Sequence, residues 1–281
     1  MRTALVVGAS SGLGYAIARW LAGEGIRTYA AARSYHAAKE PPPGCEPVVM
    51  DVTDPVSVQS AVNQTLNKAG RIDILVNCAA TLTLGAGEEL SEDELRAVME
   101  TNFFGAVRVT QAVLPIMRAQ GSGRMIQMSS LNGLMAIPFQ GAYVASKHAL
   151  EGFSEALAME ARPFGISVTL VEPGDCGGGS DTYRQKASAS ESVSSPYRDA
   201  YTAAVNQIHH DETNGQSPER VAAAVLRIVK QKRPPLRLRV ARTDQRLAVL
   251  LHDLLPGRLF QRMIASHYAP RSDTNRKGGN I

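Results

Sequence analysis

The sequence contains few cysteines, few aromatic residues and no long apolar segment. Its three cysteines, Cys45, Cys78 and Cys176, are odd in number and form no CxxC pair. We therefore expect no disulfide framework and predict a reducing compartment, the cytoplasm. The longest uncharged stretch, residues 125–146, includes amides, serines and a proline, which makes it a poor membrane span. The apolar run that starts at residue 4 is too short for a signal peptide.

Charge of neither sign dominates the composition. Lys and Arg number 30 against 26 acids, for a net charge of +4, and 44% of the residues are hydrophobic. This composition excludes a disordered chain and gives no evidence of a nucleic-acid partner. A chain of 281 residues can bury a large core without disulfides or metals. The run His209-His210-Asp211-Glu212 lies in a polar segment where adjacent histidines usually point apart, so we predict no metal site.

Short apolar runs alternate with longer amphipathic ones. Strands are expected at residues 4–7, 27–31, 47–50, 72–77, 124–128, 167–171 and 236–240. Helices are expected at 15–22, 56–69, 91–117, 143–161 and 218–230, the third opened by a capping box at Ser91–Glu94. The alternation predicts an α/β fold, a doubly wound parallel sheet of Rossmann type with helices on both faces. Ligands of such folds bind at the carboxyl ends of the strands.

The expected organisation is a single domain over residues 1–243 with a C-terminal helical extension over 244–270. Residues 177–216 are rich in Ser, Gly and Tyr and lack periodicity, so we expect an irregular substrate lid there. The leucine-rich segment 245–267 is broken at Pro256-Gly257 and carries several arginines. We favour its packing over a substrate cleft or a partner subunit above a position on a membrane surface. The polar tail 271–281 is expected to be disordered.

A glycine-rich turn follows the first expected strand and opens the first helix. Glycines let the backbone approach a pyrophosphate closely, and the helix N-terminus favours the phosphate charge. The alternative is an ordinary glycine-rich turn. The candidate cofactor-binding residues are Gly8, Ser10, Ser11, Gly12, Leu13 and Gly14.

The end of the second strand points to NADP(H) in preference to NAD(H). An acid at this position would bind a ribose 2′-hydroxyl, whereas an arginine accommodates a 2′-phosphate. The sequence has Arg33-Ser34 here and no acid, although Arg33 could also be a solvated loop charge. After the third strand, Asp51-Val52 offers a carboxylate for the adenine amino group or, as an equal alternative, a helix cap.

Tyr143 and Lys147 are spaced to share one helical face. A neighbouring ammonium and a cationic nicotinamide both favour tyrosinate, so the expected pKa of Tyr143 is lowered and the pair can move a proton at neutral pH. The competing interpretation is a half-buried Tyr beside a surface Lys. Ser130 follows the fifth strand and could bind the reacting oxygen, with Ser129 as its competitor, and Asn102 is an unusual residue inside a helix.

Together these motifs resemble the short-chain dehydrogenase/reductase family. The match covers residues 3–175 closely and extends loosely to about 265, and residues 133–158 are similar to 17β-hydroxysteroid and retinol dehydrogenases. The resemblance implies that Tyr143 is the general acid/base, that Lys147 supports it and binds the nicotinamide ribose, and that Ser130 holds the substrate oxygen. It also implies that Asn102 holds a water in a proton relay. Further cofactor contacts are implied at Asn77, Ala79, Pro173 and Gly174.

The sequence departs from the family pattern at three places. Ala80 stands where the family has a glycine, Val7 where it often has a threonine, and the usual threonine after Pro173-Gly174 is missing. Thr182 or Ser180 could replace that threonine.

The implied activity is NADP(H)-dependent interconversion of a ketone or aldehyde and an alcohol, without a metal, on an apolar steroid-, retinoid- or polyketide-like substrate. A cofactor-sensing scaffold and a sugar-nucleotide epimerase or dehydratase remain as alternatives. The family also implies a homodimer or homotetramer formed by the two long helices, with a surface supplied by Leu95, Val98, Val107, Leu114, Phe153 and Leu157.

Overall fold

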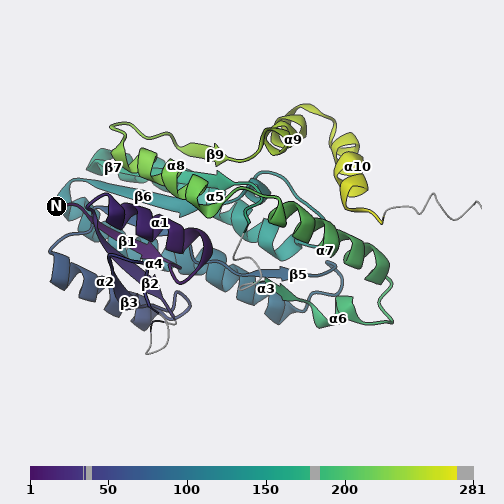
Figure 1. The fold of residues 1–281 in the computed structure, drawn as a ribbon, viewed down its shortest axis with the longest axis horizontal. Helices are drawn as coiled ribbons and strands as arrows, with labels where there is room; N and C mark the ends of the chain where they lie inside the picture. Colours follow the sequence, from purple (N-terminus) through teal and green to yellow (C-terminus); the bar gives the residue numbers. More distant parts are fainter. Residues whose placement is uncertain (34, 36–39, 178–183, 271–281) are drawn as a thin grey trace, which may run out of the picture.

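A computed structural model describes residues 1–33, 35, 40–177 and 184–270 (Figure 1). Its centre is a seven-stranded sheet in which every neighbouring pair of strands is parallel. The strand order is β3 (Cys45–Val49), β2 (Arg27–Ala32), β1 (Thr3–Val7), β4 (Ile74–Asn77), β6 (Gly123–Met128), β7 (Ile166–Pro173) and β9 (Arg237–Val240). From β1 the chain first builds the sheet outward to β2 and β3, and then returns to add β4 on the other side of β1. This switch in strand order confirms the doubly wound fold and places a ligand crevice between β1 and β4.

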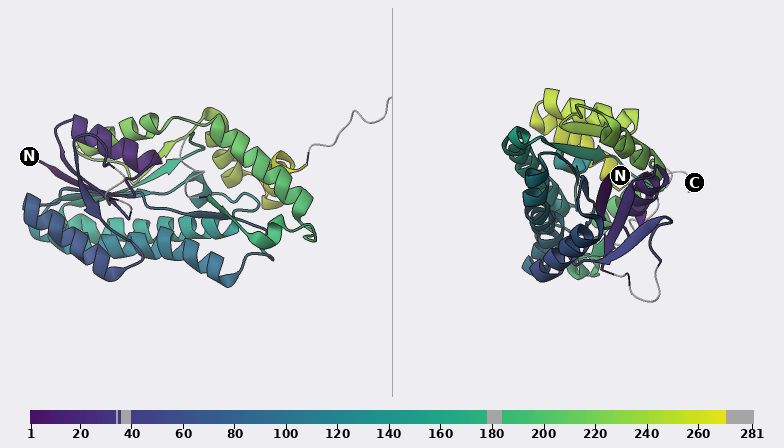
Figure 2. Two further views of the ribbon diagram at one scale, coloured as in Figure 1. Left: turned by 60° about the horizontal axis from the view of Figure 1, so that its bottom comes forward. Right: turned by 90° about the vertical axis from the view of Figure 1, so that its left-hand side faces the viewer.

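Helices cover both faces of the sheet, as Figure 2 shows. One face packs against α1 (Gly12–Gly23) and α8 (Pro218–Lys230), the other against α2 (Pro55–Ala69), α4 (Gly105–Gln120) and α5 (Gly141–Ala161). Successive residues of β1 alternate between the two cores, because neighbouring side chains of a strand point to opposite faces. Burial on both faces accounts for the continuous apolar strands of the sequence.

The helical region expected at 91–117 contains an irregular turn. Helix α3 (Glu92–Met99) begins at the predicted capping box, where the Ser91 hydroxyl accepts from the Glu94 amide at 3.2 Å. A π-helical turn, Glu100–Phe104, then joins α3 to α4. Such turns are frequent at functional sites, and this one carries the buried Asn102.

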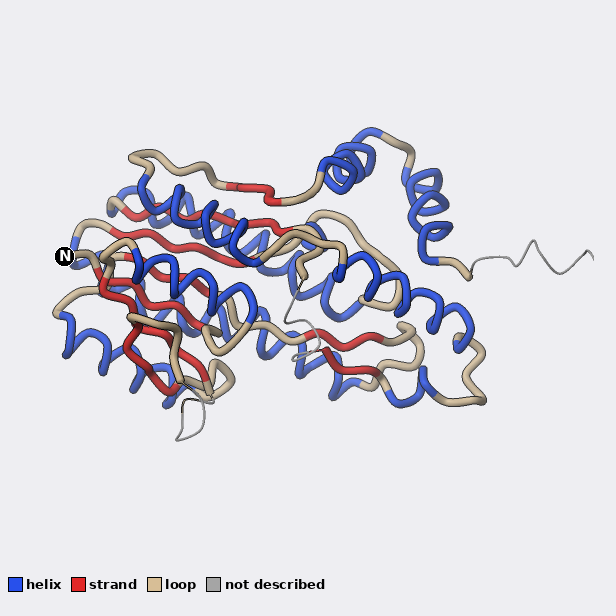
Figure 3. Tube along the Cα trace, in the orientation of Figure 1, coloured by secondary structure: helices blue, strands red, loops and turns tan. Residues whose placement is uncertain are grey.

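The prediction of an irregular segment at 177–216 is wrong for most of its described part. Strand β8 (Arg184–Lys186) pairs with β5 (Leu82–Leu84), and α6 (Ser188–Glu191) and α7 (Arg198–Thr213) follow. Figure 3 shows this small sheet and α7 beyond the end of the main sheet. Helix α7 buries only Tyr201, Ala204 and Ile208. A stripe that narrow leaves little periodicity in the sequence, which explains the error.

The C-terminal segment forms the two expected helices, α9 (Thr243–Leu254) and α10 (Gly257–Tyr268), on either side of the break at Pro256. Val249 and Phe260 pack with Leu131 and Met135 in a separate small core. In the part of the chain that the structure describes, no helix combines the length and apolar character needed to cross a bilayer. The tail predicted at 271–281 lies outside the described residues.

The proposed oligomer surface is partly unsuited to contact with another subunit. Val98 and Leu157 are buried within this chain, because both pack inward toward its own core. Leu95 is exposed, and Val107, Leu114 and Phe153 are partly exposed. Only these last four remain available for the predicted surface.

Candidate active site

A cleft of about 350 Å³ opens at the carboxyl ends of β1, β2 and β4. It collects side chains and backbone from segments that the sequence separates by more than a hundred residues. Of the predicted cofactor-binding residues it is lined by Gly8, Ser10, Ser11, Gly12, Leu13, Gly14, Arg33, Asp51, Val52, Ala79, Tyr143 and Lys147. Ala80 lines it too, and Ser34 lies outside the described residues.

Two glycines of the glycine-rich turn are packed so closely that a side chain is excluded at their positions. Gly8 has a φ of 81°, and a Cβ there would lie 2.5 Å from the amide nitrogen of Ala79. A Cβ on Gly14 would overlap the carbonyl oxygen of Gly8. Helix α1 starts from this turn, and the side chain of its N-cap residue, Ser11, makes no capping hydrogen bond. The first amides of α1 therefore remain available to an anion in the cleft.

Asp51 lies in the cleft and caps no helix. Its carboxylate accepts from the Thr53 amide at 2.9 Å and the Thr53 hydroxyl at 2.7 Å. The cap of α2 is Asp54, which accepts from the Val56 amide, so the helix-cap alternative for Asp51 is wrong. Burial tends to raise the pKa of Asp51, but the Thr53 hydrogen bonds and the charge of Arg33 lower it below its ordinary value.

Asn77 differs from the expectation for a cofactor contact. It is not among the residues that line the cleft, and its side chain is buried. The amide nitrogen donates to the Ala106 carbonyl at 3.1 Å, to Thr110 at 3.2 Å and to Gln127 at 3.0 Å. These bonds join β4 to α4 and β6, which is a structural role.

Tyr143 and Lys147 come together on α5 as predicted. The Lys147 ammonium nitrogen lies 5.4 Å from the centre of the Tyr143 ring and donates to the Met128 carbonyl at 2.8 Å. Lys147 is only 3% exposed, which excludes the alternative of a surface lysine. A buried ammonium held by one carbonyl beside a phenol is a costly arrangement that a purely structural helix would not require.

The pKa values of this pair reflect burial. Burial raises the pKa of Tyr143, and its hydrogen bond with Ser130 offsets part of the rise. Burial also lowers the pKa of Lys147 to about 8. The expected lowering of the Tyr143 pKa is therefore not produced by the chain alone. It had been expected from Lys147 together with a cationic nicotinamide.

Ser130 and Ser129 have different surroundings at the end of β6. Hydrogen bonding to Ser130 lowers the pKa of the Tyr143 phenol, and the Ser130 hydroxyl accepts from the Asn132 amide at 3.1 Å. Ser129 is buried, and its hydroxyl lies 2.7 Å from the position that a Cβ on Gly133 would occupy. Ser129 also lines the cleft beside Tyr143, so the preference for Ser130 stays a prediction.

Asn102 holds three elements together beneath the site. Its amide oxygen accepts from the Thr81 amide at 2.7 Å, and its amide nitrogen donates to the Thr81 carbonyl at 2.9 Å and to Ser146 at 3.0 Å. Ser146 is the neighbour of Lys147 on α5. The π-helical turn therefore places Asn102 next to the catalytic helix, and its part in a proton relay stays a prediction.

A second cavity of about 380 Å³ meets the first at Tyr143. The two share Leu13, Ser129, Tyr143 and Cys176. Pro173 and Gly174 line this second cavity and not the first cleft, and their contact with a cofactor stays a prediction. The predicted substitutes for the family threonine, Ser180 and Thr182, lie outside the described residues.

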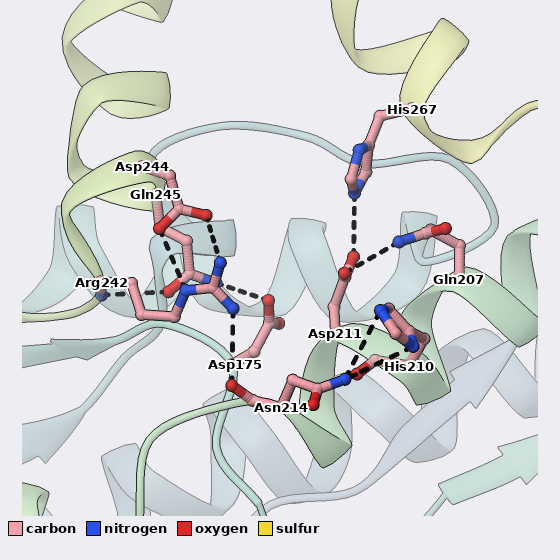
Figure 4. Close-up of polar contacts among 9 residues, drawn as sticks. All are labelled: Asp175, Gln207, His210, Asp211, Asn214, Arg242, Asp244, Gln245 and His267. Carbon is pink, nitrogen blue, oxygen red and sulfur yellow. Dashed lines mark hydrogen bonds and ion pairs between the residues drawn. The ribbon is translucent and has the colours of Figure 1, made fainter.

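Residues that the sequence did not point to form the far wall of the second cavity. Gln245 donates to Asp175 at 2.5 Å, and His267 lies 2.9 Å from Asp211 (Figure 4). Arg242 binds Asp244 through two nitrogens, at 2.8 and 3.1 Å. These contacts connect the loop after β7 and helix α7 to α9 and α10. Burial and the nearby Asp211 raise the pKa of Asp175 to about 6.

Comparison with known proteins agrees with this geometry. The family described as "short chain dehydrogenase" matches residues 2–189. A 3-ketodihydrosphingosine reductase of Bacteroides thetaiotaomicron is 39% identical, over 95% of this chain and 98% of the relative. Human 17-beta-hydroxysteroid dehydrogenase type 1 is 35% identical, over 83% of this chain and 75% of the relative.

The fold comparison gives the same result. The crystal structure of a short-chain dehydrogenase from Streptomyces avermitilis superposes with a TM-score of 0.77 at 31% identity and covers 95% of this chain and 97% of that one. The predicted resemblance is therefore confirmed: the chain belongs to the short-chain dehydrogenase/reductase family and is an oxidoreductase of that family.

Proposed function

We propose that the protein uses NADP(H) to interconvert a ketone or aldehyde and an alcohol on a largely apolar substrate. The observation that carries the proposal is the meeting of the two cavities at Tyr143, which Ser130 and Lys147 flank. One cavity has the features of a nucleotide site and the other is open to a second molecule. A scaffold that only retains the fold would not require this junction.

The residues of the first cleft fit a dinucleotide. The positions of Gly8 and Gly14 leave no room for a Cβ, and the uncapped amides of α1 suit a pyrophosphate. Arg33 lines the cleft at the end of β2, where no acid would repel a 2′-phosphate. Lys147 would hold the nicotinamide ribose. The nicotinamide, when bound, supplies or accepts the hydride, and no metal is required.

Proton movement is the task of this chain's own residues. In the reducing direction the Tyr143 phenol donates its proton to the carbonyl oxygen, which Ser130 holds by a hydrogen bond. The buried Lys147 ammonium stabilises the tyrosinate that results. Oxidation of an alcohol runs through the same groups in reverse.

The second cavity supports an apolar substrate body. Near Tyr143 it is lined by Leu82, Met135 and Ile137, and at its outer side by Met263 and Ile264. Burial of such surface against a ligand contributes about 25 cal/mol per Å². The relative named for 3-ketodihydrosphingosine reduction supports a long-chain ketone in preference to a rigid steroid.

We further propose a cytoplasmic homodimer or homotetramer. The cysteines Cys45, Cys78 and Cys176 are all free thiols, which suits a reducing compartment. Leu95, Val107, Leu114 and Phe153 offer the contact surface on α3, α4 and α5. Light scattering at micromolar concentration should give a mass of two or four chains, and a monomer would contradict the proposal.

The test of the catalytic proposal is a comparison of two tyrosine variants. With NADPH and a long-chain ketone, Tyr143→Phe should lower kcat by about 100-fold or more while cofactor binding persists. Tyr197→Phe removes a surface hydroxyl that bonds Glu88, and it should leave kcat unchanged. Retained turnover in Tyr143→Phe would refute the role of Tyr143, and cofactor binding without turnover in the wild type would favour the scaffold.

A further inference from the structure

The C-terminal helices α9 and α10 present two unlike faces. On the inner side Ala248 and Ile264 line the second cavity, and Val249 and Phe260 are buried in the small core beneath it. On the outer side of α9, Leu247, Leu250 and Leu254 are 51%, 49% and 71% exposed. The core and the cavity therefore explain only one side of these helices.

The exposed leucines are arranged as a stripe. Positions 247, 250 and 254 fall within one narrow arc of an α-helix. On α10, Leu259 and Met263 are one turn apart and also exposed. Leu254 and Leu259 stand on either side of the Pro256 corner, where Figure 1 shows the two helices at the edge of the molecule. Clustered exposed apolar side chains of this kind mark a contact surface.

Basic side chains border the stripe. Arg246 on α9 and Arg258 and Arg262 on α10 are exposed, and Arg258 and Arg262 lie one turn apart on one side of Leu259. Of the two exposed acids of α9, Asp244 pairs with Arg242 and Asp253 lies 3.2 Å from His252. The surface thus combines an apolar stripe with a cationic border.

We propose that the outer face of α9 and α10 docks on a lipid bilayer that contains anionic headgroups. Amphipathic helices with leucines on one side and arginines beside them bind at the headgroup boundary of such membranes. A second copy of the chain is a poorer occupant, because a stable protein interface takes about 20–30 residues a side and this stripe offers five apolar ones. The chain would lie on the membrane and not cross it.

The position of Met263 links this surface to the active site. Met263 is 36% exposed, follows Leu259 by one turn of α10 and also lines the second cavity. The docking face and the cavity therefore meet at one residue, and an apolar substrate in the bilayer has a short route to Tyr143. This last step rests on the proposed function, whereas docking itself does not.

Vesicle sedimentation tests the docking without catalysis. The protein is mixed with phosphatidylcholine vesicles, alone or with added phosphatidylglycerol, and the bound fraction is measured. The wild type should bind the anionic vesicles at least about tenfold more tightly than the neutral ones, as expected for several arginines near the surface. Leu250→Ser/Leu254→Ser should lose at least about tenfold in affinity because two leucines no longer enter the boundary.

Matched controls separate docking from folding. Met159→Ser and Val193→Ser remove other highly exposed apolar side chains and should leave vesicle binding unchanged. Cofactor affinity and the unfolding temperature of the double leucine variant should match the wild type, because both positions are exposed. Equal binding by wild type and double variant, or no binding to either vesicle, would overturn the proposal.

If the wild type is a dimer and the double leucine variant is a monomer, the occupant of this face is a second copy of the chain. That result would also overturn the proposal. Vesicle binding by a protein that reduces no ketone would instead count against the proposed function alone. The two ideas therefore fail in distinguishable ways.

Discussion

The cofactor cleft and the substrate cavity share Tyr143 but are built by different means. The cleft is lined chiefly by the turns that follow β1, β2, β3 and β4. The cavity is closed by α7, α9 and α10 and by a side-chain network that includes Asp175, Asp211 and Gln245. The first is a property of the sheet topology, whereas the second depends on long-range side-chain contacts.

This difference predicts that the two sites fail independently. Damage to the C-terminal helices should remove the substrate site and leave the cofactor site. Damage to the glycine turn should do the reverse.

Loss of a buried aromatic side chain under α9 and α10 should give the largest effect. Phe260 is 4% exposed and packs against His252, with ring centres 4.9 Å apart. Phe260→Ala should destabilise the packing of these helices by about 3–5 kcal/mol. Hydrogen exchange should then show faster exchange in α9 and α10, while the affinity for NADPH stays unchanged. If the faster exchange of α9 and α10 came with a lower affinity for NADPH, the two sites would be one cooperative unit.

A methyl group in the glycine turn should act on the cofactor site. The added Cβ of Gly14→Ala would overlap the Gly8 carbonyl, so the turn must open and lose its approach to a phosphate. We expect roughly 100-fold weaker NADPH binding by fluorescence titration. Gly23→Ala, at the end of the same helix with open space around it, should bind as the wild type does. Equal affinities of the two variants would refute the phosphate site.

The coenzyme preference should depend on a single side chain. Arg33→Ala should weaken NADPH binding by roughly tenfold, because a charge-assisted hydrogen bond to a 2′-phosphate is lost, and should leave NADH binding nearly unchanged. Parallel titrations with the two reduced coenzymes measure this. Tighter NADH than NADPH binding in the wild type would overturn the assignment.

The smallest expected effect is a pH dependence in the cavity wall. The pKa of Asp175 is raised to about 6, so the folded state binds its proton more tightly than the unfolded state. This contribution to stability is present at low pH and is lost as the pH rises from about 4 to 6. Relative to Asp175→Asn, which keeps an acceptor for Gln245, the wild type should lose stability over that range. Urea unfolding at each pH gives the free energy of unfolding of both proteins. A difference between them that does not change with pH would contradict the prediction.

Local motifs predicted the cleft and the central fold. The sheet strands, the glycine turn, and the Tyr143–Lys147 pair are encoded over a few neighbouring residues each, so periodicity and spacing suffice to find them. Asn77 was misplaced because a strand-end polar residue can face either the cleft or the core. Its three buried partners come from α4 and β6, which no local pattern shows.

The substrate side could not be predicted in the same way. Asp175, Asp211, Arg242 and His267 come together only after the chain has folded, and none belongs to a recognisable spacing. Helix α7 was missed because three buried residues give a weak pattern. Burial raises the pKa of Tyr143 in the chain alone, and the predicted lowering, which also needs a bound cationic nicotinamide, stays a prediction.

The most direct test of the account is to follow the hydride from one site to the other. The protein is given NADPH deuterated at C4, in each of the two configurations, with a long-chain ketone, and the alcohol product is examined by mass spectrometry. The account predicts deuterium on the carbinol carbon from one configuration only, because a single junction at Tyr143 fixes how the two sites meet. Alcohol without deuterium from either form would contradict direct transfer between the two cavities.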